Sequence, residues 1–190
     1  STGLRSRVRI AQASARLIAE HGLTDWSAAK RKACRELGLS DNEPLPSNDE
    51  VEQALRDYNS LFRRDAQTAS LREQRRAALR WMDQLAVWHP VLLGGVAAGW
   101  ATAYSEIRIE LEAEDPKAVE MGLINAAVDY APAAGSGLPE LVAGRGESAV
   151  RLVVVTAAQR RNRGRRDESA RLSRDELRSM LDAQSSSAPG

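Results

Sequence analysis

Three charged residues, Glu106, Arg108 and Glu110, alternate with aliphatic residues along the segment 105–112. Side chains of a strand alternate between its two faces, so a strand in this segment carries all three charged side chains on one face. One or two carboxylates are enough to bind Mg²⁺, and a guanidinium can bind a phosphate through two hydrogen bonds. The segment therefore predicts a metal- and phosphate-binding face, with a solvated edge strand of self-compensating charges as the alternative.

Two glycines, Gly94 and Gly95, follow the apolar run 91–93 and precede the charged segment. Glycine allows close approach of the backbone to a ligand, and a helix that begins near Val96 directs free N–H groups toward an anion. We therefore expect Gly94, Gly95 and Arg108 to contact a phosphate group. A tight strand-to-helix turn that serves packing alone is the alternative explanation of the glycines.

A third carboxylate, Asp129, lies in the segment 128–131, which predicts another strand. The helix predicted over residues 116–124 is long enough for a crossover, so this strand could lie beside the segment 105–112. An acidic side chain in an apolar strand is costly to bury unless it is paired or bound to a metal. Asp129 is therefore a candidate ligand together with Glu106 and Glu110, and a solvent-facing or turn-capping position is the alternative.

The order of these features resembles the nucleotidyltransferase superfamily over residues 91–130. Members of that superfamily have an apolar strand followed by Gly-Ser, a short helix with Arg-Gly, Ser-Asp-x-Asp on a strand, and a later strand with a third carboxylate. The corresponding residues in this chain are Leu93-Gly94-Gly95, Ala98-Gly99, Ser105-Glu106-Ile107-Arg108 and Asp129. The chain departs from the pattern at Gly95, Ala98, Glu106 and Arg108.

The resemblance implies a nucleotidyltransferase-like core that binds a nucleotide with Mg²⁺. An active member would transfer a nucleoside monophosphate to a hydroxyl of a protein, an RNA or a small molecule. It implies Glu106, Glu110 and Asp129 as catalytic and metal-binding residues, with Gly94, Gly95 and Arg108 at the phosphates. Arg108 replaces the second aspartate, and a positive charge about 4 Å from the metal costs several kcal/mol. Either the chain has lost the activity or Glu110 replaces the missing ligand.

Arginines gather in a second segment, 160–166, which follows the strand predicted over 149–156. The segment predicts an exposed basic loop whose side chains contact RNA phosphates, and it consists of Arg160, Arg161, Arg163, Arg165 and Arg166. No aromatic residue interleaves with them, so base stacking is not indicated. The alternative function is a non-enzymatic RNA-binding or regulatory protein-interaction module that uses this segment and the N-terminal half of the chain (residues 1–88), which is predicted to be helical. A further group of arginines lies on a predicted helix, at positions 72, 75, 76 and 80. These arginines could also contact phosphates, and a solvated helix face is the alternative explanation.

Periodicity and end signals predict an α+β fold. We expect a helical region over residues 1–88, a small mixed sheet with flanking helices over 89–182, and a disordered tail over 183–190. Helix starts are indicated at Asp25, at the capping boxes Ser47–Glu50 and Ser173–Glu176, and at Asp115-Pro116. Strands are expected at 91–93, 105–112, 128–131 and 149–156, with a flexible segment over 131–139 and a last helix that ends near Leu181.

The composition is that of an ordinary globular protein. The 190 residues are 43% hydrophobic and 28% charged, with a net charge of +1. One cysteine and two histidines exclude an intrachain disulfide and argue against a zinc site. The chain has no apolar run of about 18 residues and no apolar signal core at its start, so we expect a cytoplasmic protein without a membrane span. The partners expected are a nucleotide, an RNA or a protein, and the oligomeric state is left open.

Overall fold

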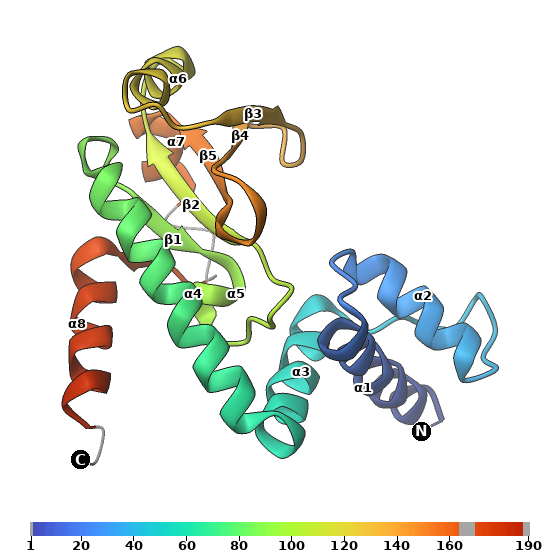
Figure 1. Cartoon of the computed structure of the whole chain (residues 1–190). Coiled ribbons are helices and arrows are strands. Elements are labelled where there is room, and N and C mark those ends of the chain that lie inside the picture. Colours follow the sequence, from blue (N-terminus) through green and yellow to red (C-terminus); the bar gives the residue numbers. More distant parts are fainter. Residues whose placement is uncertain (1, 164–169, 188–190) are drawn as a thin grey trace. The chain divides into compact units, whose positions relative to one another are not determined.

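The computed structural model describes residues 2–163 and 170–187 and has a mixed α+β architecture (Figure 1). Its contacts divide the chain into two compact units. The helical unit contains the residues up to Leu71 together with Trp100–Ser105, and the sheet unit contains Arg72–Gly99 and the described residues from Glu106 onward. None of the helices in the described residues is both long and apolar enough to cross a membrane.

The helical unit is built on α1 (Thr2–His21), α2 (Trp26–Glu36) and α3 (Asn48–Phe62). One side of α1 packs on α3 and another side packs on α2, through residues that include Ala15 with Leu55 and Ile10 with Ala33. The predicted helix starts are confirmed, because Asp25 accepts a hydrogen bond from the backbone of α2 and Ser47 and Glu50 form a capping box on α3.

The segment Trp100–Ser105 belongs to the helical unit, although it interrupts the stretch that resembles a nucleotidyltransferase. The rings of Trp100 and Trp26 lie 4.9 Å apart. The side chains of Asn59 and Gln67 donate hydrogen bonds to the backbone carbonyls of Trp100 and Ala101. The chain therefore leaves the sheet unit after Gly99 and returns to it at Glu106.

The sheet unit contains a six-stranded mixed sheet in the order β3-β4-β5-β2-β1-β6. Only β2 and β5 are parallel neighbours, and the other pairs are antiparallel. The strands are β1 (Val91–Leu93), β2 (Ile107–Glu112), β3 (Tyr130–Ala133), β4 (Glu140–Ala143), β5 (Val150–Val155) and β6 (Leu172–Ser173).

Helices connect and flank these strands in Figure 1. The α-helices after α3 are α4 (Arg64–Gln84), α5 (Gly94–Ala98), α6 (Pro116–Asn125), α7 (Ala157–Arg163) and α8 (Arg174–Ser186). Two short 3-10 helices, η1 (Ala86–Trp88) and η2 (Gly146–Ser148), lie between them. The starts predicted for α6 and α8 are confirmed by Asp115 at the N-cap with Pro116 in the first turn, and by the capping box of Ser173 with Glu176.

The two faces of the sheet differ in chemistry. On β2 the buried side chains of Ile107, Ile109 and Leu111 alternate with Arg108, Glu110 and Glu112. The register pairs Arg108 with Arg151 of β5, which therefore carries its side chain to the same face. The predicted alternation in β2 is confirmed, but this strand is central in the sheet and is not an edge strand.

The structure corrects several local predictions. The strand near Asp129 begins only at Tyr130, and β4 and β5 lie between it and β2, so the expected adjacency is wrong. The strands β4 and β6 were not predicted, and β3 includes residues 131–133 of the segment that was predicted to be flexible. Residues 157–163 form the helix α7, where an exposed loop was predicted from residue 160. The helix α8 continues to Ser186, so residues 183–186 of the expected disordered tail are helical.

Candidate functional site

Glu110 is the centre of the charged face of the sheet. Its side chain is completely buried, and three arginines donate hydrogen bonds to its carboxylate. Arg160 Nε lies 2.9 Å from Oε1, Arg163 Nη1 lies 2.9 Å from Oε2, and Arg171 Nη2 lies 2.5 Å from Oε1. Both oxygens of Glu110 are therefore bound by guanidinium groups, in the arrangement that we call the Glu110 cluster (Glu110, Arg160, Arg163 and Arg171).

The fold brings these four residues together from distant parts of the chain. Arg160 and Arg163 lie three positions apart on α7, so their side chains leave the same side of that helix. Arg171 directly precedes β6, which pairs with β1, and β1 pairs with β2. Arg160 also donates to the backbone carbonyls of His89 and Glu110.

The charges of the cluster keep Glu110 ionised. Burial alone would raise the pKa of Glu110, but its ion pairs with Arg171 and Arg160 outweigh this effect, so the pKa lies below the ordinary value. Arg160 also lies 3.8 Å from the carboxylate of Glu112. Among the residues that the structure describes here, three guanidiniums thus face two carboxylates.

A second group of ion pairs lies on the same face, on β2, β4 and β5. Arg151 binds Glu106 through two hydrogen bonds of 3.1 and 3.0 Å, and it lies 3.6 Å from Glu140. The nearly buried carboxylate of Glu140 accepts hydrogen bonds from the backbone N–H and hydroxyl of Ser136, and Arg108 lies 3.8 Å away. Burial raises the pKa of Glu140, but the hydrogen bonds from Ser136 and the two arginines lower it by more, so the net shift is downward.

The predicted phosphate-binding residues occupy different environments. Gly94 has a φ of 70°, a left-handed conformation that favours glycine, and a Cβ placed on it would lie 3.7 Å from Cδ of Arg108. Gly95 is buried within the short helix α5. The side chain of Arg108 is 40% exposed and contacts solvent from the charged face. Gly94 and Arg108 are therefore close neighbours, and their contact with a phosphate stays a prediction.

The structure does not bring Asp129 to this face. Its side chain is largely exposed and forms an ion pair of 2.6 Å with Arg145, and its backbone carbonyl accepts a hydrogen bond from Gly144. Glu106 is bound by Arg151, and Glu110 is bound by three arginines. Within the described residues, no three histidine, cysteine or carboxylate side chains are grouped to hold a metal. As arranged, these three carboxylates do not fit a shared Mg²⁺ site.

The arginine-rich segment is only partly a free surface. Arg160 and Arg163 are bound to Glu110, whereas Arg161 is exposed on α7. Arg165 and Arg166 lie outside the described residues.

The earlier arginine group also contains a buried member. Arg75 on α4 is 6% exposed and donates hydrogen bonds of 2.9 and 3.0 Å to the carbonyls of Val96 and Ala97 in α5. A solvated helix face is therefore the wrong description of Arg75.

Sequence reasoning missed three residues of the charged face, Arg151, Arg171 and Glu140. Arg151 is the only charged residue of the predicted strand 149–156, and this isolation was a usable signal. Arg171 and Glu140 had no local signal, because their partners are reached only through strand pairing.

Comparisons of the chain with protein-family models, curated proteins and solved structures found no match. The resemblance to the nucleotidyltransferase superfamily therefore rests on residues 91–130 of this chain alone.

Proposed function

We propose that this protein binds a phosphorylated ligand, with nucleotides as the candidate class, at the charged face of the sheet and without catalytic metal ions. The observation that carries the proposal is the convergence of three arginines on one carboxylate, that of the buried Glu110. Guanidinium groups neutralise the carboxylates that a nucleotidyltransferase would use for metal ions. The nucleotidyltransferase-like core thus becomes a binding module.

The three arginines that the described part of the chain places around Glu110 support an anionic ligand. Arg163 reaches Glu110 through Nη1, and its side chain is 34% exposed, so we assign its remaining guanidinium N–H groups to the ligand. A guanidinium with exposed N–H groups binds phosphate oxygens in a fork geometry, and partial burial strengthens such a contact. Arg108, also part-exposed on this face, provides a second phosphate contact beside Gly94.

Thermal unfolding with ligands tests the proposal directly. We expect a nucleoside triphosphate or inorganic pyrophosphate, added with EDTA, to stabilise the protein, by about 2.7 kcal/mol at 100 times the dissociation constant. Arg163→Gln should weaken this binding, and the matched control Arg161→Gln, on the exposed neighbour of the same helix, should retain it. No stabilisation by any of the four nucleoside triphosphates or by pyrophosphate overturns the proposal.

The same experiment distinguishes a metal-dependent nucleotidyltransferase. In that case stabilisation requires Mg²⁺, and Glu106→Gln abolishes both nucleotide binding and turnover. Metal-independent binding that survives Glu106→Gln supports the binding module.

RNA binding through the arginine-rich segment is the alternative function. Among the arginines of this segment that the structure describes, Arg161 is the exposed one. Binding of an RNA oligonucleotide should weaken steeply between about 50 and 200 mM salt if phosphate contacts dominate. Loss of that binding in Arg161→Gln, without loss of nucleotide binding, would favour the RNA-binding module.

A further inference from the structure

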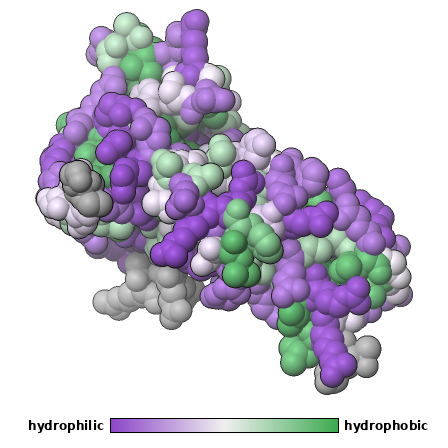
Figure 2. Space-filling view, turned by 60° about the horizontal axis from the view of Figure 1, so that its bottom comes forward, coloured by the Kyte–Doolittle hydropathy of each residue, from purple (hydrophilic) through white to green (hydrophobic). Residues whose placement is uncertain are grey.

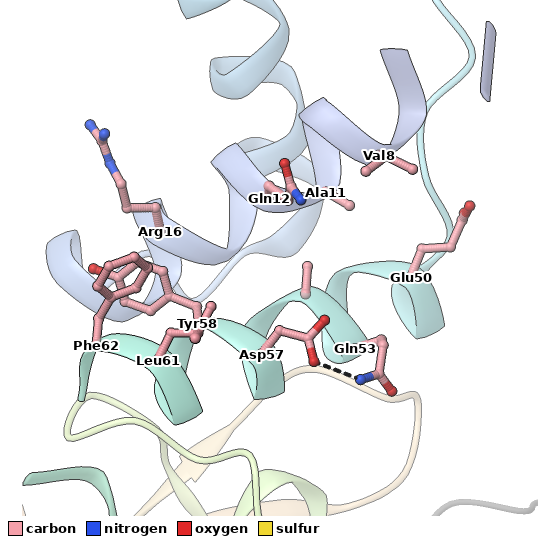
Figure 3. A pocket seen from close by; sticks show the side chains of 11 residues that line it. Val8, Ala11, Gln12, Arg16, Glu50, Gln53, Asp57, Tyr58, Leu61 and Phe62 are labelled. Atoms are coloured by element: carbon pink, nitrogen blue, oxygen red, sulfur yellow. Dashed lines mark hydrogen bonds between the residues drawn. The ribbon is translucent and has the colours of Figure 1, made fainter. Parts of the chain in front are cut away.

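The helical unit carries an apolar groove between α1 and α3, far in sequence from the charged strands (Figure 3). The groove has a volume of about 490 Å³. Val8 and Ala11 of α1 and Tyr58, Leu61 and Phe62 of α3 form its apolar lining. In Figure 3 the side chains of the two helices approach the groove from opposite sides.

The two helices run in the same direction along the groove. Arg7 near the start of α1 pairs with Glu50 near the start of α3 at 2.7 Å. Near the other end, Tyr58 donates a hydrogen bond to Glu20, and Arg63 donates one to the carbonyl of Ala19. Each helix therefore forms one continuous wall of the groove.

Large apolar side chains remain exposed along both walls. Val8 on α1 is 47% exposed, and Leu61 and Phe62 on α3 are 76% and 73% exposed. Leu4, one helical turn before Val8, is 60% exposed and lies outside the lining. Figure 2 shows that hydrophobic residues form separate patches on a mainly hydrophilic visible surface. Single exposed apolar residues need no explanation, but several that border one groove indicate an interaction surface.

The two helices that form the walls carry opposite net charges of equal size, and the charged residues in the lining itself follow the same division, with Arg16 on α1 and Glu50 and Asp57 on α3. The charged residues of α1 are four arginines and one glutamate, which gives a net charge of +3 (Arg5, Arg7, Arg9, Arg16 and Glu20). Those of α3 are four acidic residues and one arginine, which gives −3 (Asp49, Glu50, Glu52, Asp57 and Arg56). A surface with one basic and one acidic wall is complementary to itself.

We propose that this groove is an interface that binds a second copy of the chain. In a two-fold contact the same surface patch is used by both copies. A two-fold axis parallel to α1 and α3 sets the basic α1 of each copy against the acidic α3 of the other. An axis across the helices would instead set α1 against α1, where like charges repel. The parallel axis also brings the apolar residues of the four helices together at matching levels.

The mass of the full chain in solution tests this interface. We expect sedimentation or light scattering over about 1–500 µM to show a species with twice the 20.7 kDa of one chain. Leu61→Asp should raise the dissociation constant about tenfold or more, because it adds a charge to the apolar contact. The matched control is Val87→Asp, which makes the same kind of change at a side chain that is 72% exposed and does not line the groove. This control should leave the mass unchanged.

Charge reversal tests the proposed pairing of α1 with α3. Arg5→Glu with Arg9→Glu makes both walls acidic, and Asp49→Lys with Asp57→Lys makes both walls basic. Each double variant alone should be monomeric, and an equimolar mixture should form a heterodimer, which also shows that both variants are folded. A wild-type chain that stays monomeric throughout the concentration range overturns the proposal. The groove would then be free to bind another partner, such as a helix of a different protein, but not a second copy of the chain. A dimer that is insensitive to Leu61→Asp and to charge reversal overturns it as well.

Discussion

Arg160 Nε lies 2.9 Å from Glu110 Oε1, although fifty residues separate the two in the sequence. The same guanidinium donates a hydrogen bond of 2.8 Å to the carbonyl of His89, which precedes β1. One arginine side chain therefore connects α7, the central strand β2 and the turn before β1. The Glu110 cluster accordingly contributes to the fold as well as to the charge of the proposed binding face.

Replacement of Glu110 should strongly destabilise the protein. Glu110→Gln keeps the shape of the side chain but leaves three arginines, which are only 18 to 34% exposed, without their buried carboxylate. Removal of one partner from a buried ion pair costs about 3–5 kcal/mol. Urea unfolding measures this loss. The control, Glu106→Gln, changes a carboxylate that is 51% exposed, and it should cost no more than about 1 kcal/mol. Equal losses in the two variants would contradict the structural role of the Glu110 cluster.

The stability of the protein should fall on acidification through the pKa range of Glu110 and Glu140. Both pKa values lie below the ordinary value in the folded protein, so the unfolded chain binds more protons as the pH falls through about 4.3. The stabilising contribution is complete above the unfolded pKa and is lost as the pH falls through the lower folded pKa. Urea unfolding at a series of pH values between about 3 and 7 measures this slope. In Glu110→Gln the slope below about pH 5 should be shallower, and an unchanged slope would contradict the assignment.

The parts of the fold that depend on local signals were predictable from the sequence. Caps such as Ser47 with Glu50 act within one helical turn, and the alternation in β2 follows from the two-residue repeat of a strand. The strand β5 was predicted because its β-branched residues form a continuous run. Each of these features is set by neighbours within a few residues.

Of the candidate site, only the charged residues of the central strand β2 could be predicted from the sequence. The arginines near residue 160 were predicted to lie in an exposed loop, because nothing in the local sequence shows that Glu110 is their partner. The strand expected at Asp129 was predicted to lie beside β2, because it is the next predicted strand along the chain, whereas β4 and β5 lie between the two in the sheet. Both errors arise from pairing across the sheet, which local propensity does not encode.

Substitution of Gly94 tests whether its backbone conformation or its small size is required. With a φ of 70°, Gly94→Ala should lose about 1–2 kcal/mol, since an L-residue with a Cβ is strained in the left-handed region. The new Cβ would meet Arg108 Cδ at 3.7 Å, an ordinary contact, so crowding adds little. Gly94→Asn should be less costly, because asparagine tolerates this region better. Thermal unfolding of the two variants measures the difference, and a larger loss in Gly94→Asn would identify crowding as the cause.

Arg75 should not tolerate replacement by lysine, although the charge is kept. Its Nε and Nη2 bind the carbonyls of Val96 and Ala97 at the end of α5, where helical carbonyls lack partners within the helix. The compact ammonium of lysine cannot reproduce this fork, so Arg75→Lys should leave a buried carbonyl unpaired at a cost of about 1–3 kcal/mol. Arg76→Lys changes the exposed neighbour on the same helix and should alter the free energy of unfolding by less than about 0.5 kcal/mol. Urea unfolding compares the two, and hydrogen exchange of the α5 amides should accelerate only in Arg75→Lys. If both variants unfold at the same urea concentration as the wild type, the two hydrogen bonds contribute no net stability, and burial of the aliphatic part of Arg75 is sufficient.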